Sequence, residues 1–311
     1  MPAISDVRTL LGDDAWWAGP PMFGVRPLDV ASMPFNQTFS VAENYVHVGS
    51  AEMFSVDYEV WNGTSAAKGH MTSVQSALGT SAVAGPKVGD QAIYYGSQAS
   101  GAAPFQTVTI VRVGQVVALI GLDLKDGFPK VAQLGKIAVK VVSRLKDVLA
   151  GKVASTPLST SDAALLPPAN LDITMLGSTT ISVESAMVML DAPSFDALAQ
   201  TLRGSGVSDV VFGDYALNSD THMEVRAAVF NFSTAKDAAD WIAGLRGTTA
   251  ADQLGLYDAA HGWYIFPFAA GTKAALLICR STADTEAASR ACEGPLSSIT
   301  SVWKLSLGSQ S

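Results

Sequence analysis

Charge is scarce in this sequence, and positive charge is the scarcer kind. Charged residues make up 15% of the 311 residues, and 20 Lys and Arg stand against 28 Asp and Glu, so the formal net charge is −8. Proteins that bind nucleic acid use Lys and Arg to displace counterions from phosphate groups. The charge balance therefore argues against nucleic acid as a partner, while a hydrophobic fraction of 48% indicates a folded protein.

Long hydrophobic runs are also missing. The most apolar stretch, residues 108–124, contains Arg112, Gln115 and Asp123 and alternates as strands do, so it is too short and too polar to span a membrane. The first residues, MPAISDVRTLLGDD, have no basic region followed by an apolar one and do not form a signal peptide. We expect no transmembrane segment. The protein is then either cytoplasmic or exported with its leader missing from this sequence.

Motifs that carry chemistry are absent too. The sequence has no G-x-x-x-x-G-K-[ST], no H-E-x-x-H, no G-x-S-x-G and no paired C-x-x-C, so we predict no cofactor, no metal site and no catalytic residue. The four histidines have no carboxylate or nucleophile at a telling spacing. The residues favour a protein without catalysis, but an enzyme whose site is assembled from dispersed residues stays open.

Cysteine occurs only twice, at Cys279 and Cys292. Cys279 ends a strand pattern, AALLICR, and Cys292 lies in the helix pattern that follows, DTEAASRACEG. Two buried thiols are one interpretation of this pair, and a disulfide from strand to helix is the other. A disulfide would close a loop of about 14 residues and stabilise the fold by roughly 3 kcal/mol.

What the sequence does contain is an internal repeat. The stretch 229–245, VFNFSTAKDAADWIAGL, echoes 60–74, VWNGTSAAKGHMTSV. Each copy is typical of a strand end, an Asn, a small polar cap and an Ala-rich helix. In the later copy Thr234 and Asp237 have the spacing of a capping box. Two copies of one supersecondary unit predict a tandem of related domains.

The domain boundaries follow from this repeat. Residues 1–35 read as an N-terminal extension, 36–150 as the first repeat, 151–170 as a Ser-, Thr- and Pro-rich linker, and 171–311 as the second repeat with an extra lead-in strand and helix. Each repeat reads as α+β, a mostly antiparallel sheet with helices on one face. Trp16 and Trp17 in the extension pack on their own domain, or they bind a partner or a second copy in a homo-oligomer.

The central strands carry a further signal. In the stretch 116–122, VVALIGL, both pleat faces are apolar, whereas a sheet covered on one face alone should alternate apolar and polar residues. We therefore expect these strands to be covered twice, by helices and by something else. The sheet of the sister repeat, a ligand or a second subunit are the alternatives.

Aromatic residues in the middle strands give the best indication of a ligand site. Tyr94 and Tyr95 in the first repeat loosely match Trp263 and Tyr264 in the second, and His261 lies just before that second pair. Aromatic side chains on both pleat faces suit a core on one side and a pocket or interface on the other. Packing in the core alone is the simpler interpretation.

The chain resembles the two-domain exported lipoproteins of unknown function found in mycobacteria and other actinobacteria. The residues behind the resemblance are the FNFSTAKDAADWIAGL unit, the low-charge composition and the late Cys279/Cys292 pair. The resemblance implies a cell-envelope protein that binds a ligand or partner without catalysing a reaction. Our leading hypothesis is a non-enzymatic protein that holds an apolar small molecule or a protein partner between its two domains. The alternatives are a structural or assembly subunit that docks through its Trp-rich extension, and an enzyme.

Overall fold

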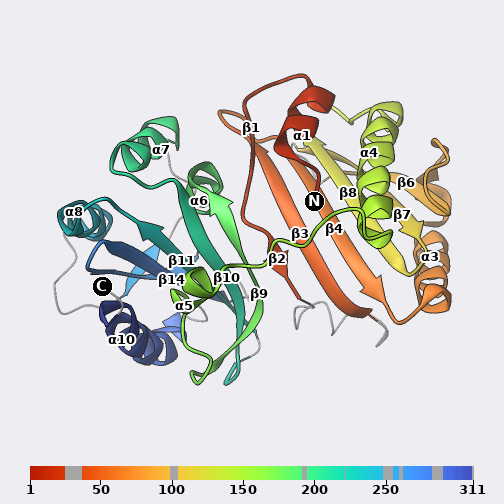
Figure 1. Cartoon of the computed structure of the whole chain (residues 1–311). Coiled ribbons are helices and arrows are strands. Elements are labelled where there is room, and N and C mark those ends of the chain that lie inside the picture. Colours follow the sequence, from red (N-terminus) through yellow and green to blue (C-terminus); the bar gives the residue numbers. More distant parts are fainter. Residues whose placement is uncertain are drawn as a thin grey trace. The chain divides into compact units, whose positions relative to one another are not determined.

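The computed structural model describes residues 1–24, 37–98, 104–190, 195–220, 222–247, 255–258, 262–281 and 290–309 (Figure 1). These residues form two compact units, and the division between them falls after Ser155. Each unit is an antiparallel sheet with helices packed on it, so the predicted α+β class in two tandem parts is confirmed. Within the described ranges, none of the helices combines the length and hydropathy needed to cross a bilayer.

The first unit is built on the longer sheet. Its elements, in chain order, are α1 (Ile4–Leu11), β1 (Trp16–Ala18), β2 (Met22–Phe23), β3 (Gln37–His47), β4 (Met53–Trp61), α3 (Thr64–Leu78), the short 3-10 helix Gly79–Ser81, β5 (Ala82–Val83), β6 (Gln91–Gln98), β7 (Phe105–Val113), β8 (Val116–Leu124) and α4 (Val131–Leu149).

The second unit is built in the same manner. Its elements, in chain order, are α5 (Thr160–Ala164), β9 (Ile173–Ser182), α6 (Val183–Met189), α7 (Phe195–Gly204), β10 (Asp209–Leu217), β11 (Met223–Asn231), α8 (Ala235–Arg246), β12 (Leu256–Asp258), β13 (Trp263–Ala270), β14 (Lys273–Ser281) and α10 (Glu293–Gly308).

The two sheets share one strand order. Neighbouring strands run β1-β3-β4-β8-β7-β6-β5 in the first unit, with β2 paired to β3, and β12-β13-β14-β11-β10-β9 in the second. The inner path β3-β4-β8-β7-β6 therefore corresponds to β10-β11-β14-β13-β12. In both units a helix follows the second strand of this path, and another helix follows its last hairpin. The repeat seen in the sequence is thus a repeat of topology.

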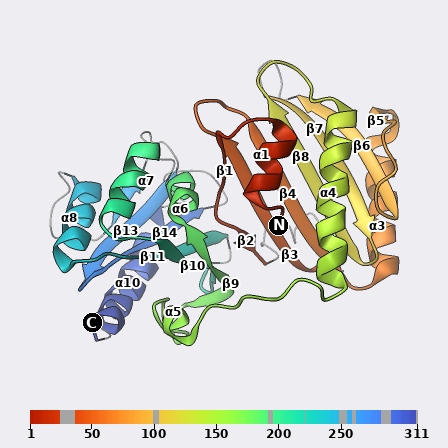
Figure 2. The ribbon, with the colours of Figure 1, turned by 45° about the horizontal axis from the view of Figure 1, so that its top comes forward.

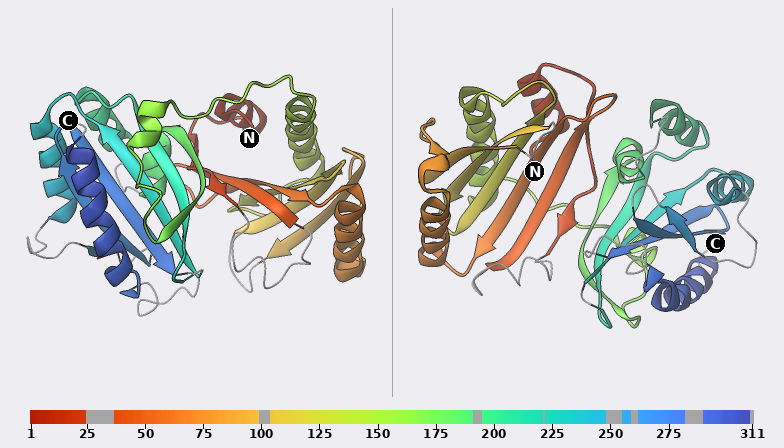
Figure 3. Two further views of the ribbon diagram at one scale, coloured as in Figure 1. Left: turned by 60° about the horizontal axis from the view of Figure 1, so that its bottom comes forward. Right: turned by 180° about the vertical axis from the view of Figure 1, so that it is seen from behind.

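The helices do not lie on one face of each sheet, as the sequence predicted, but on both faces. In the first unit Val116 and Ala118 of β8 belong to the core under α4, whereas Val117 between them belongs to the core under α3. Successive strand residues point to opposite faces of a sheet, so α3 and α4 cover opposite faces (Figure 3). Helices on both faces explain why the central strands are apolar on both.

The second unit repeats this arrangement. Val225 and Ala227 of β11 lie in the core that contains Trp303 of α10. Phe230 has the opposite parity along β11, and its ring lies 4.6 Å from that of Trp241 on α8. The strands therefore lie between α8 and α10 (Figure 1).

Two local features differ from what the sequence pattern alone favours. The stretch 186–190 is apolar enough to continue a buried strand, but β9 ends at Ser182 and α6 follows. The side chain of Ser182 accepts a hydrogen bond from the Ser185 N–H, which starts the helix. Gly294 and Pro295 would interrupt the interior of a helix, but they lie in the first turn of α10, which begins at Glu293. Proline is tolerated there because N–H groups in the first turn have no partner within the helix.

Candidate functional site

Helices α7 and α8 lie side by side in the second unit (Figure 2). Residues of both helices line a groove with a volume of about 460 Å³. The α7 wall is formed by Leu198, Thr201 and Leu202, which share one face of the helix because they lie three and four residues apart. Phe232, directly after β11, also lines it. Helix α7 packs on α6, and α8 packs on β13 and β14, so different elements hold the two walls in position.

The α8 wall is formed by residues at the same helical spacing. They are Asp237, Asp240, Trp241, Gly244 and Leu245. Below this wall, Ala238 and Ile242 are buried against the sheet. The helix therefore holds its groove residues in place through the opposite, packed face.

Trp241 is the central aromatic residue of the groove. Its ring lies 4.6 Å from that of Phe230 and 5.8 Å from that of Phe232. The indole Nε1 is buried and has no hydrogen-bond partner among the described residues. A buried donor without an acceptor carries a desolvation cost of roughly 1–3 kcal/mol.

The charged residues of the groove lining are both acidic. The carboxylate of Asp237 accepts a hydrogen bond of 2.7 Å from the Thr234 hydroxyl, and Asp240 forms an ion pair with Lys236. Lys236 is exposed and does not line the groove. The lining thus favours a neutral or cationic ligand over an anion.

The first unit has a different side chain at the equivalent place. His70 and Trp241 each lie seven residues after the N-cap of their helix, Gly63 or Thr234. The His70 ring stacks on Trp61 at 4.3 Å, and the Trp241 ring lies 5.8 Å from Phe232, which follows β11 as Trp61 ends β4.

In the first unit the polar atoms of Trp61, Glu59 and His70 lie close to one another. Trp61 Nε1 donates a hydrogen bond of 3.1 Å to Glu59, and His70 Nε2 lies 3.6 Å from the same carboxylate oxygen. Burial lowers the pKa of His70, which disfavours the cation that Glu59 would attract. The backbone N–H groups of Trp61 and Phe232 donate to the carbonyls of Gln115 and Thr272, which occupy the same place in their hairpin turns. The second unit therefore has Phe230 at the position of Glu59, and Trp241 gains no such acceptor.

The aromatic residues expected to bind a ligand are spread over several places. Tyr94 and Tyr95 lie on opposite faces of β6. Tyr94 is 2% exposed and donates a hydrogen bond to the carbonyl of Pro86, and Tyr95 packs on the core under α3. Trp263 and Tyr264 begin β13, and Tyr264 belongs to the core of the second unit. His261 lies outside the described residues.

The expected match between these pairs does not hold in the topology. Strand β13 corresponds to β7, and the counterpart of β6 is β12. Strand pairing decides which strands correspond, and the order of aromatic residues along the chain does not indicate that pairing.

Trp16 and Trp17 are tied to the first unit. Trp16 is 2% exposed, belongs to the core under α4, and lies edge-on to His47 at 5.3 Å. Strand β1 pairs with β3, and the Arg8 guanidinium lies 4.2 Å from the centre of the Trp17 ring. Partner binding through this segment stays a prediction.

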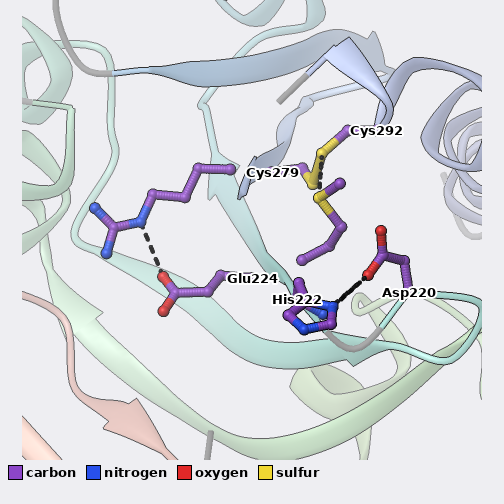
Figure 4. Close-up of a disulfide and its surroundings, with 7 residues drawn as sticks. Asp220, His222, Glu224, Cys279 and Cys292 are labelled. Carbon is purple, nitrogen blue, oxygen red and sulfur yellow. Dashed lines mark hydrogen bonds and ion pairs between the residues drawn. A yellow bond between two sulfur atoms is a disulfide. The ribbon is translucent and has the colours of Figure 1, made fainter. Parts of the chain in front are cut away.

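Cys279 and Cys292 form a disulfide, which confirms that interpretation of the pair (Figure 4). It joins β14 to the residue before α10, and Met223 Sδ lies 3.4 Å from the Cys292 sulfur. Nearby, His222 Nδ1 lies 3.2 Å from Asp220, and both side chains are exposed (Figure 4). The described residues contain no group of three or more His, Cys, Asp or Glu that could hold a metal.

Sequence reasoning missed Trp241 as a site residue. Its helix was predicted, and the spacing from Asp237 to Leu245 was visible, but the same spacing also fits a helix face turned to solvent. Trp241 becomes a site residue because α7 lies opposite α8. The sequence pattern of α7 does not indicate which helix α7 faces.

No protein-family model and no curated protein matches the chain. Among solved structures, the crystal structure of the extracellular domain of PknH from Mycobacterium tuberculosis is similar to part of it. The two are 12% identical, the match covers 47% of this chain and 93% of the PknH chain, and the TM-score is 0.38. A likeness of this strength carries no argument about function.

Proposed function

We propose that the protein is a non-enzymatic binding protein that holds a neutral or cationic apolar small molecule in the α7–α8 groove. A volume of about 460 Å³ falls within the range of roughly 300–1,000 Å³ typical of small-molecule sites. Such sites combine apolar and aromatic walls with a few polar groups. Trp241, Phe232 and the leucines supply the walls here, and the two aspartates supply the polar groups.

The observation that carries the proposal is the contrast at one helical position. His70 in the first unit stacks on Trp61 beside the buried carboxylate of Glu59. Trp241 in the second unit has an indole N–H without an acceptor among the described residues and lies on an open groove. Among the described residues, the second unit combines this helical position with a lined groove and an indole N–H that has no acceptor.

We place the protein in an oxidising, extracytoplasmic compartment. The Cys279–Cys292 disulfide supports this placement because structural disulfides persist in secreted and periplasmic proteins and are rare in the cytosol. A cell-envelope setting agrees with the resemblance noted from the sequence. A ligand site between the two units, assembly through the extension of residues 1–35, and catalysis are the alternatives.

The experiment is a fluorescence titration with N-phenyl-1-naphthylamine, a neutral apolar probe that brightens on leaving water and takes up energy from nearby Trp. We expect saturable binding by the intact protein. Gly244→Leu should weaken it about tenfold, which is 1.4 kcal/mol. A Cβ at Gly244 meets nothing within 4 Å, so the new side chain extends into the groove without a backbone clash.

Gly69→Leu is the matched control. Gly69 is an exposed glycine of α3, and a Cβ there also meets nothing within 4 Å. This variant should bind the probe as the unaltered protein does. Absence of saturable binding, or equal affinity in the Gly244→Leu and unaltered proteins, would rule out the α7–α8 groove as the binding site.

A further inference from the structure

The basic residues of the chain are concentrated in one segment. Residues 125–152 contain seven of the 20 Lys and Arg and only two acidic residues, Asp126 and Asp147, so the segment has a net charge of +5 in a chain of net charge −8. The basic residues are Lys125, Lys130, Lys136, Lys140, Arg144, Lys146 and Lys152. Positive charge is therefore focused on α4 and its two ends.

Helix α4 points this charge outward. Helix α4 lies along the sheet (Figure 2). Its inner face is formed by buried residues such as Leu134, Val141 and Leu145. Lys136 and Lys140 lie on the opposite, exposed face. Among the described residues, the segment forms one side-chain ion pair, between Lys152 and Asp147 at 3.1 Å. The remaining cations thus lie open to solvent without an anionic partner in that part of the chain.

Apolar side chains are exposed among these cations. Val139, between Lys136 and Lys140, is 54% exposed. Val148 and Leu149 at the end of α4 are 48% and 52% exposed, and Phe128 before the helix is 51% exposed. A surface helix that only needs solubility would carry polar residues at these positions.

We infer that the outer face of α4 binds an anionic lipid surface. Ammonium groups attract the phosphates of an anionic bilayer. Aliphatic and aromatic side chains enter the boundary between headgroups and acyl chains, while the long lysine side chains reach back to the phosphates. An acidic protein or polymer would match the charge of α4 but would not use its exposed apolar side chains.

The test is flotation of the full-length protein with vesicles of phosphatidylcholine alone and of phosphatidylcholine mixed equally with phosphatidylglycerol. We expect binding to the mixed vesicles only, and weaker binding as salt is raised. The triple variant Lys136→Gln, Lys140→Gln, Lys146→Gln should bind at least about tenfold more weakly. Val139→Ser should also weaken binding while leaving the charge unchanged.

The control variant is Lys68→Gln, Lys87→Gln, Lys304→Gln, which removes three exposed lysines from other elements and makes the same change in net charge. It should bind the mixed vesicles as the unaltered protein does. Circular dichroism melting checks that both triple variants remain folded. Equal losses in the two triple variants would contradict a surface on α4. Binding to soluble polyglutamate in place of vesicles would assign the surface to an acidic polymer and overturn the inference.

Discussion

Asp123 is a buried carboxyl in the sheet of the first unit. Its side chain, near the end of β8, is 6% exposed, and Oδ1 has no hydrogen-bond partner within the described ranges. Burial raises the pKa of Asp123, although a hydrogen bond with Gln106 acts in the opposite direction. A carboxyl whose pKa is higher in the folded state binds its proton more tightly there, so its contribution to stability is lost as the pH rises through that folded pKa.

Removing this charge should therefore stabilise the protein at neutral pH. We expect Asp123→Asn to raise the melting temperature at pH 7, and the gain to disappear below the ordinary aspartate pKa of 3.8, where the native carboxyl is already neutral. The measurement is calorimetry over a series of pH values. Asp126→Asn, three residues on and exposed, should leave the melting temperature unchanged. A lower melting temperature for Asp123→Asn at pH 7 would contradict this account.

Single elements were predictable where one local interaction decides them. The Thr234 hydroxyl accepts a hydrogen bond from the Asp237 N–H, as the spacing indicates, and donates one to the Asp237 carboxylate, so the start of α8 follows from the sequence. The boundary between β9 and α6 did not, because residues 183–189 are apolar enough for a buried strand and only the Ser182 cap favours a helix. The groove was not predictable, since its two walls come from helices separated by β10 and β11.

The cap of α8 gives a prediction for this element. Thr234→Ala removes the oxygen that accepts the Asp237 N–H at 3.1 Å, and we expect a loss of about 1 kcal/mol in the free energy of unfolding. The loss is measured from the urea-induced unfolding transition of the second unit. Thr72→Ala is the control, because that hydroxyl bonds to Lys68 within α3 and its removal should change stability by less than about 0.5 kcal/mol. Equal effects from the two substitutions would show that the cap is not what stabilises α8.

At the scale of the molecule, the repeat was visible in sequence but its layering was not. Apolar residues on both faces of the stretch 116–122 correctly predicted that other elements pack on both faces of this strand. A single sequence cannot distinguish a helix from a sheet as the second cover, since either one buries the same side chains. The structure supplies helices from the same unit, α3 and α4, and this choice makes each unit complete in its own core.

Complete cores lead to a prediction for the whole chain. In the first unit the buried side chains group under α3 and α4, and in the second a core runs from Leu165 to Leu307. We therefore expect the fragments 1–155 and 156–311 to fold separately, each with a cooperative melting transition by circular dichroism. The second fragment should also keep its disulfide and bind N-phenyl-1-naphthylamine as the full chain does. A fragment 1–115, which removes β8 and α4 from the first sheet, is the control and should be unfolded, because β8 pairs with both β4 and β7. If 1–155 or 156–311 proved unfolded while the full chain melted in one transition, the two units would depend on each other for stability.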